Sequence, residues 1–326
     1  MEPRIEHPLA VFRRREQDVG LINERRLRRS LAQGTHVRVV AGSYADRRHW
    51  DRLSPMNRHF VRTLETADRL RGAAVFCHYA AAAIWGIDIL GRWPAVIDVR
   101  IPRGSGGRSS GAVRRRALGF DGVDVVPWGA HLVTTPAQTV IDLARELTFT
   151  AGVAAMDRAS WGRREGGPLT TSAEILESLE RQSGARGMIR ARRAAAFATH
   201  LSDSVRESQS RVAIDRLGFP TPELQRRIRL PSGRSVYPDF FFEEFDHAGE
   251  FDGKGKYFDP DILQGRSPQQ ALLEEKDRED ELRRAVRALS RWRTPALQDP
   301  RMLYDILTAD GLPSRRPRPR VGLRWD

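Results

Sequence analysis

One segment in the last third of the chain limits its fold more than any other. Residues 234–245, RSVYPDFFFEEF, form an apolar, aromatic-rich run, and the turn-like DHAG and then EFDG follow it. Two strands joined by a short turn fit this pattern. Side chains alternate between the two faces of a strand, so Glu250 and Asp252 share one face while Phe251 lies on the other. The pattern predicts a hairpin with acidic side chains along one face of a sheet.

The acidic residues of this hairpin are candidates for a metal site. Asp239 belongs to the first strand, and antiparallel pairing brings it close to the acidic face. Like charges on neighbouring strands repel, and a hard divalent cation with oxygen ligands removes that repulsion. Bound Mg²⁺ activates water and stabilises charge during phosphodiester cleavage. We therefore expect Asp239, Glu250 and Asp252 to bind Mg²⁺ or Mn²⁺, and Lys254 to position or deprotonate the nucleophile.

The distribution of lysine points to the same region. The chain has 55 basic residues, and all of them except Lys254, Lys256 and Lys276 are arginine. Arginine cannot replace a compact ammonium group whose pKa can be tuned. Because the three lysines fall within one short window, we expect chemistry within residues 236–280.

The spacing of these residues resembles a known nuclease motif. The pattern PD-x10-E-x-D-G-K, from Pro238 to Lys254, is similar to that of PD-(D/E)xK nucleases, and most of all to their restriction-endonuclease-like, Vsr-related branch. The resemblance covers about residues 200–295 and implies Mg²⁺-dependent cleavage of DNA. The lysine follows Asp252, and not Glu250, at the two-residue spacing, so either carboxylate can be the main second ligand. A domain of this fold that binds only nucleic acid or a partner is the alternative.

Two flanking features agree with this resemblance. Residues 202–219 are predicted to form a helix that ends at Gly218. Nuclease-like folds often carry an acidic residue in this helix, and Glu207 is the match. His247 falls in the predicted turn, where we expect a solvated histidine.

A long helix is predicted after the hairpin, over residues 268–292. Its apolar stripe consists of Leu282, Val286 and Leu289. Glu275 and Glu279 turn toward the sheet upstream of that stripe, and Lys276 on its flank is assigned to a phosphate contact or to a displaced catalytic ammonium. The alternative is that the charges form surface i,i+4 pairs, namely Glu274–Arg278, Glu279–Arg283 and Asp280–Arg284.

Residues 11–45 are predicted to form a small DNA-binding unit. Asn23 can cap a basic helix that Gly34 ends, HVRVV alternates like a strand, and AGSY is typical of a turn. A winged helix-turn-helix presents its recognition helix and wing in this order. The side chains expected to contact DNA are Arg25, Arg26, Arg28, Arg29 and Arg38. The alternative is an ordinary solvated arginine face.

The middle of the chain is predicted to be a mixed α/β unit, with a helix over residues 54–71, a strand within 95–102 and a helix from TTPAQTVIDLARELT. Three patterns, GTHVRVVAGSYA, AVFCHYAAAAIWGI and LVTTPAQTVIDLAR, resemble the AbiEi family of abortive-infection antitoxins in the same order. The resemblance covers about residues 10–160. It implies a winged-helix transcriptional repressor or antitoxin, with a cognate toxin or a second copy of the chain as a protein partner.

Composition excludes several classes of protein. Cys77 is the only cysteine, so a disulfide scaffold is excluded and a buried core thiol is expected. The eight histidines show no spacing suited to zinc. We find no apolar run long enough to span a membrane and no signal-peptide core, so we expect a cytoplasmic protein. The net charge of +13 favours nucleic acid as the partner.

These observations predict an α/β (α+β) chain of several parts. The predicted parts are a winged helix (1–65), an AbiEi-like α/β domain (66–160), a basic connector (161–200), a nuclease-like mixed sheet flanked by helices (201–310) and a disordered basic tail (311–326). The function expected is binding of double-stranded DNA together with Mg²⁺-dependent endonuclease activity. The alternative is a non-catalytic repressor or antitoxin. RNA binding is a weaker alternative, because the stacking aromatic residues of RNA modules are not evident.

Overall fold

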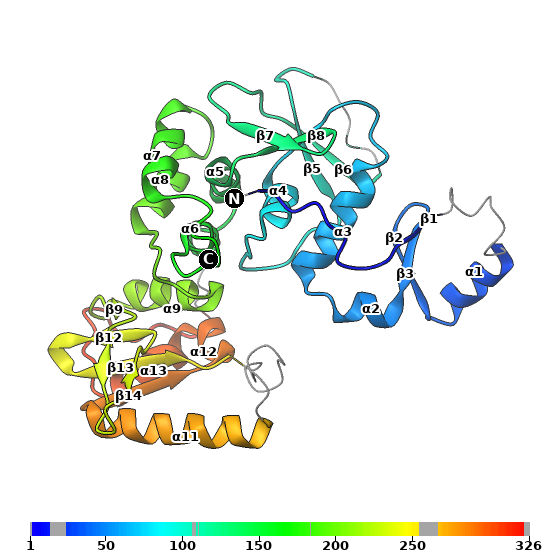
Figure 1. Cartoon of the computed structure of the whole chain (residues 1–326). Helices are drawn as coiled ribbons and strands as arrows, with labels where there is room; N and C mark the ends of the chain where they lie inside the picture. Colours follow the sequence, from blue (N-terminus) through cyan, green and yellow to red (C-terminus); the bar gives the residue numbers. More distant parts are fainter. Residues whose placement is uncertain are drawn as a thin grey trace. The chain divides into compact units, whose positions relative to one another are not determined.

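The fold combines helices with mixed sheets in two compact units, residues 1–199 and 200–326 (Figure 1). The computed structural model describes residues 2–13, 24–105, 109, 111–182, 184–253 and 267–322. This is the predicted α+β class. Each unit is described separately below.

The N-terminal unit begins with a small antiparallel sheet in the order β1-β3-β2. Its elements are β1 (Phe12–Arg13), β2 (His36–Val40) and β3 (Ser43–Asp46), preceded or followed by α1 (Glu24–Ala32), α2 (Arg47–Arg52) and α3 (Pro55–Ala67). Gly34 ends α1 because its φ of +72° lies in the left-handed region that favours glycine. The predicted order of helix, strand and turn is confirmed. The predicted cap, Asn23, lies outside the described residues.

A second sheet forms the centre of this unit, in the order β6-β5-β4-β8-β7. Its strands are β4 (Val75–Phe76), β5 (Ile97–Ile101), β6 (Val113–Ala117), β7 (Val125–Trp128) and β8 (His131–Thr134). The helices of this part of the unit are α4 (His78–Trp85), α5 (Pro136–Glu146), α6 (Phe149–Ser160), α7 (Ser172–Arg181) and α8 (Met188–Phe197). Thr135 caps α5 through Gln138, as the Thr-Thr-Pro signal predicts. Cys77 is buried, as predicted.

Residues 161–200 differ from the predicted connector. They contain α7 and α8, which bury Ile175 and Leu179 and also Ala191 and Ala194. These apolar side chains need a surface to cover, and the helices pack on α5 and α6 of the same unit. Residues 161–199 therefore form part of the N-terminal unit.

The C-terminal unit is built on a mixed sheet in the order β14-β13-β12-β9. Its strands are β9 (Glu223–Leu224), β12 (Phe240–Phe242), β13 (His247–Phe251) and β14 (Ala288–Trp292), and a separate pair consists of β10 (Ile228–Arg229) and β11 (Ser235–Val236). The predicted hairpin is confirmed, because β12 pairs antiparallel with β13. Strand β14 pairs with β13 in parallel.

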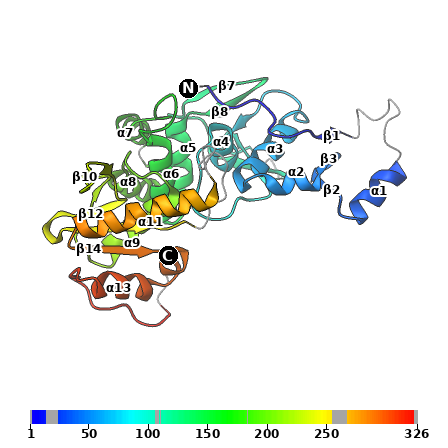
Figure 2. The ribbon, with the colours of Figure 1, turned by 60° about the horizontal axis from the view of Figure 1, so that its bottom comes forward.

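Helices cover both faces of this sheet (Figures 1 and 2). They are α9 (Val205–Arg216), α11 (Pro268–Ala285), α12 (Thr294–Gln298) and α13 (Pro300–Ala309). Phe240 and Phe251 pack in one core with Ile214 of α9, whereas Phe241 packs in a second core with Leu282 of α11. The alternation of the strand side chains thus divides the unit into two cores, and the face that bears Glu250 is the one that α11 covers.

Two predictions for this unit are wrong. The turn of the hairpin is not DHAG, because a 3₁₀ helix, η2 (Glu243–Phe245), and the left-handed Asp246 make the turn. His247 therefore lies in β13, buried, with its Nε2 2.8 Å from the Ser290 hydroxyl.

The predicted helix over residues 268–292 is also too long. Helix α11 ends at Ala285 and the last residues form β14, because ladder hydrogen bonds with β13 replace a further turn of helix. The apolar residues of the predicted stripe, Leu282, Val286 and Leu289, still share one core.

The basic segment after α13 is held against its own unit, whereas we predicted a disordered tail. The Ser314 hydroxyl donates to the Leu217 carbonyl at 2.6 Å, and the Arg315 amide donates to the Gly218 carbonyl at 2.9 Å. Arg318 pairs with Asp305 of α13. The segment has no regular secondary structure as far as residue 322, where the described part ends, yet these contacts fix its course.

Candidate functional site

The acidic residues predicted to form the site meet at one end of the β12–β13 hairpin. Phe240 pairs with Gly249, and the same register continued by one residue places Asp239 opposite Glu250. The Phe251 amide donates to Asp239 Oδ2 at 2.8 Å, which holds this carboxylate beside the second strand. Residues directly opposite each other share a face of the sheet. Asp239 and Glu250 therefore lie opposite each other, and Asp252 follows two residues further along on the same face.

Glu250 is bound by two arginines. Arg278 of α11 donates from Nη1 to Oε1 at 2.9 Å and from Nη2 to Oε2 at 3.2 Å, so its guanidinium forms a bidentate pair. Arg291 of β14 lies directly opposite Glu250 in the parallel ladder, with Nε 3.5 Å from Oε2. Since the Glu250 side chain is only 8% exposed, these cations offset the cost of burying its charge.

Asp252 has a comparable partner. Its backbone amide donates to the Trp292 carbonyl at 2.9 Å, which continues the parallel ladder by one residue. Arg293 then lies next to it and donates from Nε to Oδ2 at 2.7 Å. Arg293 is 62% exposed, so this pair lies at the edge of the site that faces solvent.

Glu207 reaches the same region from the first turn of α9. Its Oε2 accepts a hydrogen bond from the Asp203 amide at 2.7 Å and its Oε1 from the Ser204 hydroxyl at 2.9 Å. Burial, and then the negative charge of Asp239, raise the pKa of Glu207 to about 7. A carboxyl group that holds a proton near neutral pH beside another carboxylate is typical of catalytic and metal sites, as well as of some structural networks.

Of the three lysines, only Lys276 lies in the described part of the chain, and it does not join this cluster. Lys254 and Lys256 lie outside the described residues. Lys276 is exposed on α11. It is two positions from Arg278, which is about 200° around a helix, so it projects away from Glu250. Glu279, expected to turn toward the sheet, is half-buried and pairs with Arg283 of α11, one of the predicted surface pairs, and with Arg291 of the sheet.

Sequence reasoning missed the three arginines of the site, Arg278, Arg291 and Arg293. The spacing of Arg291 and Arg293 carries a signal, because residues two positions apart on a strand share one face. The spacing could not be used for the prediction, because residues 288–292 were expected to continue a helix, where residues two positions apart do not share a face.

The donor set fits a hard divalent cation in chemistry, since carboxylate oxygens are the ligands that Mg²⁺ prefers. Asp239, Glu250 and Asp252 are the residues that would hold the ion. In the described part of the chain, no three acidic, histidine or cysteine side chains converge tightly enough to enclose one. Arginines already bind Glu250 and Asp252, so an ion would have to displace them.

The predicted DNA-contacting residues also gather on one element and its neighbour. Helix α1 buries Leu27, whereas Arg25, Arg26, Arg28 and Arg29 on α1 and Arg38 on β2 are exposed. Helix α3 supports this small sheet, because the buried Glu65 accepts hydrogen bonds from Arg13 of β1 and from Ser43 of β3. The structure thus places a basic helix beside an anchored antiparallel hairpin.

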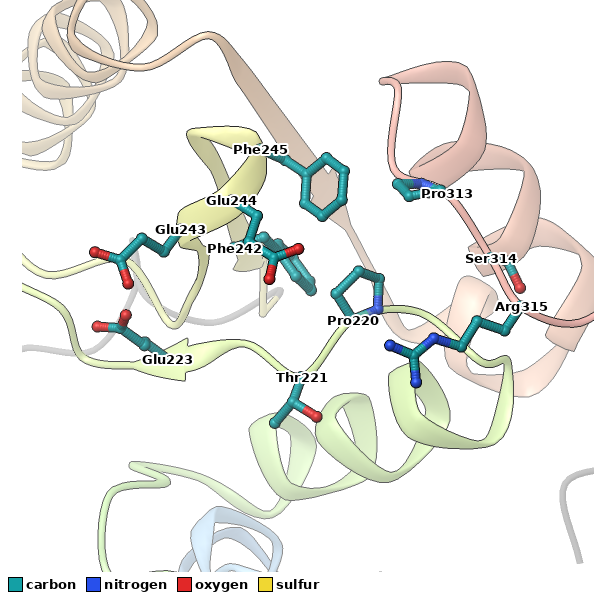
Figure 3. A pocket seen from close by; sticks show the side chains of 10 residues that line it. All are labelled: Pro220, Thr221, Glu223, Phe242, Glu243, Glu244, Phe245, Pro313, Ser314 and Arg315. Carbon is teal, nitrogen blue, oxygen red and sulfur yellow. The ribbon is translucent and has the colours of Figure 1, made fainter.

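A cavity of about 430 Å³ lies at the other end of β12 (Figure 3). The carboxylates of Glu223 and Glu243 lie close together on its rim, and Arg226 bridges them at 2.7 and 3.1 Å. Pro313 and Ser314 form the opposite wall. The cavity contains none of the predicted site residues, and Arg226 offsets one of the two charges of its acidic pair.

Comparison with known proteins gives distant relatives. Two uncharacterized proteins of Mycobacterium tuberculosis, from two strains, are each 29% identical to this chain over 181 residues. The match covers 56% of this chain and 63% of each relative, so the chain spans less than two thirds of the length of these relatives. No known protein-family profile matches the sequence.

None of the helices in the described residues combines the length and the hydrophobicity that crossing a lipid bilayer requires.

Proposed function

We propose that this chain is a DNA-binding protein of the defence or toxin–antitoxin type whose C-terminal unit is a Mg²⁺-dependent DNA endonuclease. The observation that carries the proposal is the placement of Asp239, Glu250 and Asp252 on one face at one end of the hairpin, with Glu207 close enough for the charge of Asp239 to raise its pKa. Neighbouring carboxylates repel one another, and a divalent cation removes that repulsion.

The residues of the site have separate parts in this proposal. Asp239, Glu250 and Asp252 hold the ion, which when bound supplies an activated water and stabilises charge on the scissile phosphate. Glu207, with a pKa near neutrality, holds or releases a proton next to Asp239. Arg278, once displaced from Glu250, is placed on α11 to contact a phosphate oxygen with its planar fork.

Cleavage of supercoiled plasmid by the full chain tests the enzymatic half. With Mg²⁺ we expect conversion to nicked or linear DNA, which a chelator stops and which Asp239→Ala abolishes. The matched control is Asp215→Ala, an exposed aspartate of α9 in the same unit, which should cleave normally. Equal and negligible cleavage by the unaltered chain and by Asp239→Ala would remove the enzymatic claim.

A second candidate function has its own supporting observation. Glu250 and Asp252 are each paired with arginine, as expected of a domain that uses these charges for stability alone. Under this alternative the chain is a non-catalytic repressor or antitoxin whose C-terminal unit binds nucleic acid or a protein partner, a cognate toxin or a second copy. Binding to its own promoter would then be unaffected by Mg²⁺ and by Asp239→Ala.

Both functions include DNA binding through α1. Changing Arg26 and Arg29 together to Ala should weaken binding to duplex DNA several-fold or more and make the salt dependence shallower, because fewer phosphates are neutralised. The control is Arg71→Ala, an exposed arginine of the same unit. Undiminished affinity of the double variant would remove α1 as the DNA-contacting helix.

A further inference from the structure

A cavity of about 570 Å³ lies in the N-terminal unit, between the end of α5 and the start of α8. Pockets for small molecules commonly have volumes of this order. Three arginines line it, Arg145, Arg186 and Arg190, together with His78, Asp142 and Glu146.

The start of α8 is open toward this cavity. Gly187 is the N-cap of the helix, so no side chain caps its first amides. Gly187 has a φ of +83°, and a Cβ there would lie 2.7 Å from the Arg145 carbonyl oxygen, so only glycine brings this helix start so close to α5. The Met188 amide donates to the Ala185 carbonyl at 3.3 Å, so it is the helix dipole, together with the amides that follow Met188, that favours a negative charge at this end.

Two of the arginines are fixed in place. Arg145 donates from Nε to the Arg186 carbonyl at 2.8 Å. Arg190 donates from Nη1 to the carbonyls of Glu146 and Leu147, each at 3.2 Å. These contacts orient both groups. Nη1 of Arg145 also lies 3.7 Å from Asp142 Oδ1. Since a guanidinium has five N–H donors, Arg190 keeps further donors for a ligand.

The two carboxylates of the cavity are already balanced by other arginines. Asp142 accepts two hydrogen bonds at 3.1 Å from Arg100. Glu146 accepts one at 2.7 Å from Arg116. Neither Arg100 nor Arg116 lines the cavity. Three arginines against two carboxylates leave the lining with a formal charge of about +1, and Arg100 and Arg116 behind it add to this positive balance.

His78 is the second feature that indicates a ligand. Its side chain is only 2% exposed. Its Nε2 lies 3.5 Å from Glu146 Oε1, whereas its Nδ1 has no hydrogen-bond partner among the described residues and lies 3.8 Å from Asp142 Oδ2. Its φ is +50°, an uncommon conformation for any residue except glycine. Buried polar atoms normally have partners, and backbone strain of this kind concentrates at ligand sites.

We propose that this cavity binds the phosphate group of a small phosphorylated molecule, with the start of α8, Arg186 and Arg190 on the phosphate and His78 at its inner wall. The proposal is independent of the function proposed above. The cavity contains no residue of α1 or of the hairpin, and the inner position of His78 requires a ligand that enters rather than one that lies across the surface.

Calorimetry on the full chain tests this proposal with three probes: inorganic phosphate, adenosine 5′-monophosphate and adenosine. We expect the two phosphate-containing probes to bind and adenosine not to. Arg190→Ala and Arg186→Ala should each weaken binding by about tenfold or more, whereas Arg71→Ala should not. Arg186→Ala also covers the case in which Arg190→Ala disturbs the contact between α5 and α8.

The same experiment distinguishes a small phosphorylated molecule from DNA as the source of the phosphate. Duplex DNA that competes with inorganic phosphate, and loses affinity in Arg186→Ala, would show that the cavity takes a DNA phosphate and overturn the small-molecule assignment. No heat from either phosphate probe, or equal affinity in both arginine variants and the unaltered chain, would overturn the site itself.

Discussion

Buried acidic residues have different kinds of partner in the two units. In the N-terminal unit, Asp98 is fully buried and accepts hydrogen bonds from Arg114 at 2.6 and 2.9 Å and from Arg116 at 2.8 Å. In the C-terminal unit, Glu207 has backbone and hydroxyl donors, and burial together with the charge of Asp239 raises its pKa. A buried carboxylate that is fully paired with arginines indicates a structural role, whereas a buried carboxyl group next to another carboxylate indicates a functional site.

Glu250 and Asp252 lie between these two cases. They share the crowded end of the hairpin with Asp239, and they have arginine partners like those of Asp98. Metal binding can distinguish the two roles at these residues. A purely structural ion pair stabilises the fold whether or not a metal ion is present. An ion pair between arginine and a metal ligand breaks when the ion binds the carboxylate.

The largest expected effect on the unfolding free energy is that of removing the Asp98 carboxylate, which has a structural role. Asp98→Ala leaves Arg114 and Arg116 beside a buried site without their carboxylate, and breaking such a pair costs about 3–5 kcal/mol of unfolding free energy. Urea unfolding measures this cost, with exposed Asp121→Ala as the control at about 0.5 kcal/mol or less. A cost for Asp98→Ala as small as that of the control would contradict the structural assignment.

A smaller effect is expected for Arg278→Gln. Without metal, the loss of the bidentate pair should lower the unfolding free energy by about 2 kcal/mol, since Glu250 keeps Arg291 as a second partner. With saturating Mn²⁺ the cost should shrink, because the ion replaces the lost cation and binds Glu250 without competition.

The control for this change is Arg283→Gln, which removes a pair with Glu279 on the same helix. If Arg278→Gln lowers the unfolding free energy by the same amount with and without Mn²⁺, Glu250 has a structural role like that of Asp98.

The smallest expected effect is the pH dependence due to Glu207. Its pKa is raised from 4.5 to about 7, so the folded state holds the proton more tightly than the unfolded state. The contribution of protonated Glu207 to the stability of the folded state is therefore complete below about pH 4.5 and is lost as the pH rises through about 7. The difference in unfolding free energy between the unaltered chain and Glu207→Gln should change by on the order of 1–2 kcal/mol over this interval, after allowance for solvent screening. A difference that stays constant with pH would show that neither burial nor Asp239 raises the pKa of Glu207.

Local signals in the sequence predicted much of the fold. Ser54-Pro55 and Thr135-Pro136 each begin a helix because a hydroxyl cap and a proline at the first turn act within a few residues. The hairpin of β12 and β13 followed from its apolar, aromatic-rich run and a turn close after it, although the turn itself was placed too far along the chain. These features do not depend on distant parts of the chain.

Features set by tertiary pairing escaped prediction. Residues 288–292 continue the apolar period of α11, yet they form β14 because pairing with β13 outweighs a local preference. The arginines on Glu250 come from α11 and β14, and neither can be assigned before that register is known. His247 is predicted in the turn because the left-handed Asp246, which moves the turn upstream, has no strong sequence signal.

Titration of the full chain with Mn²⁺ by calorimetry tests most directly whether the hairpin carboxylates hold a divalent ion. We predict saturable binding of one ion per chain, which Asp239→Asn and Glu250→Gln each abolish and Asp215→Ala leaves unchanged. Absence of saturable heat, or equal binding by the unaltered chain and both carboxylate variants, would contradict the account.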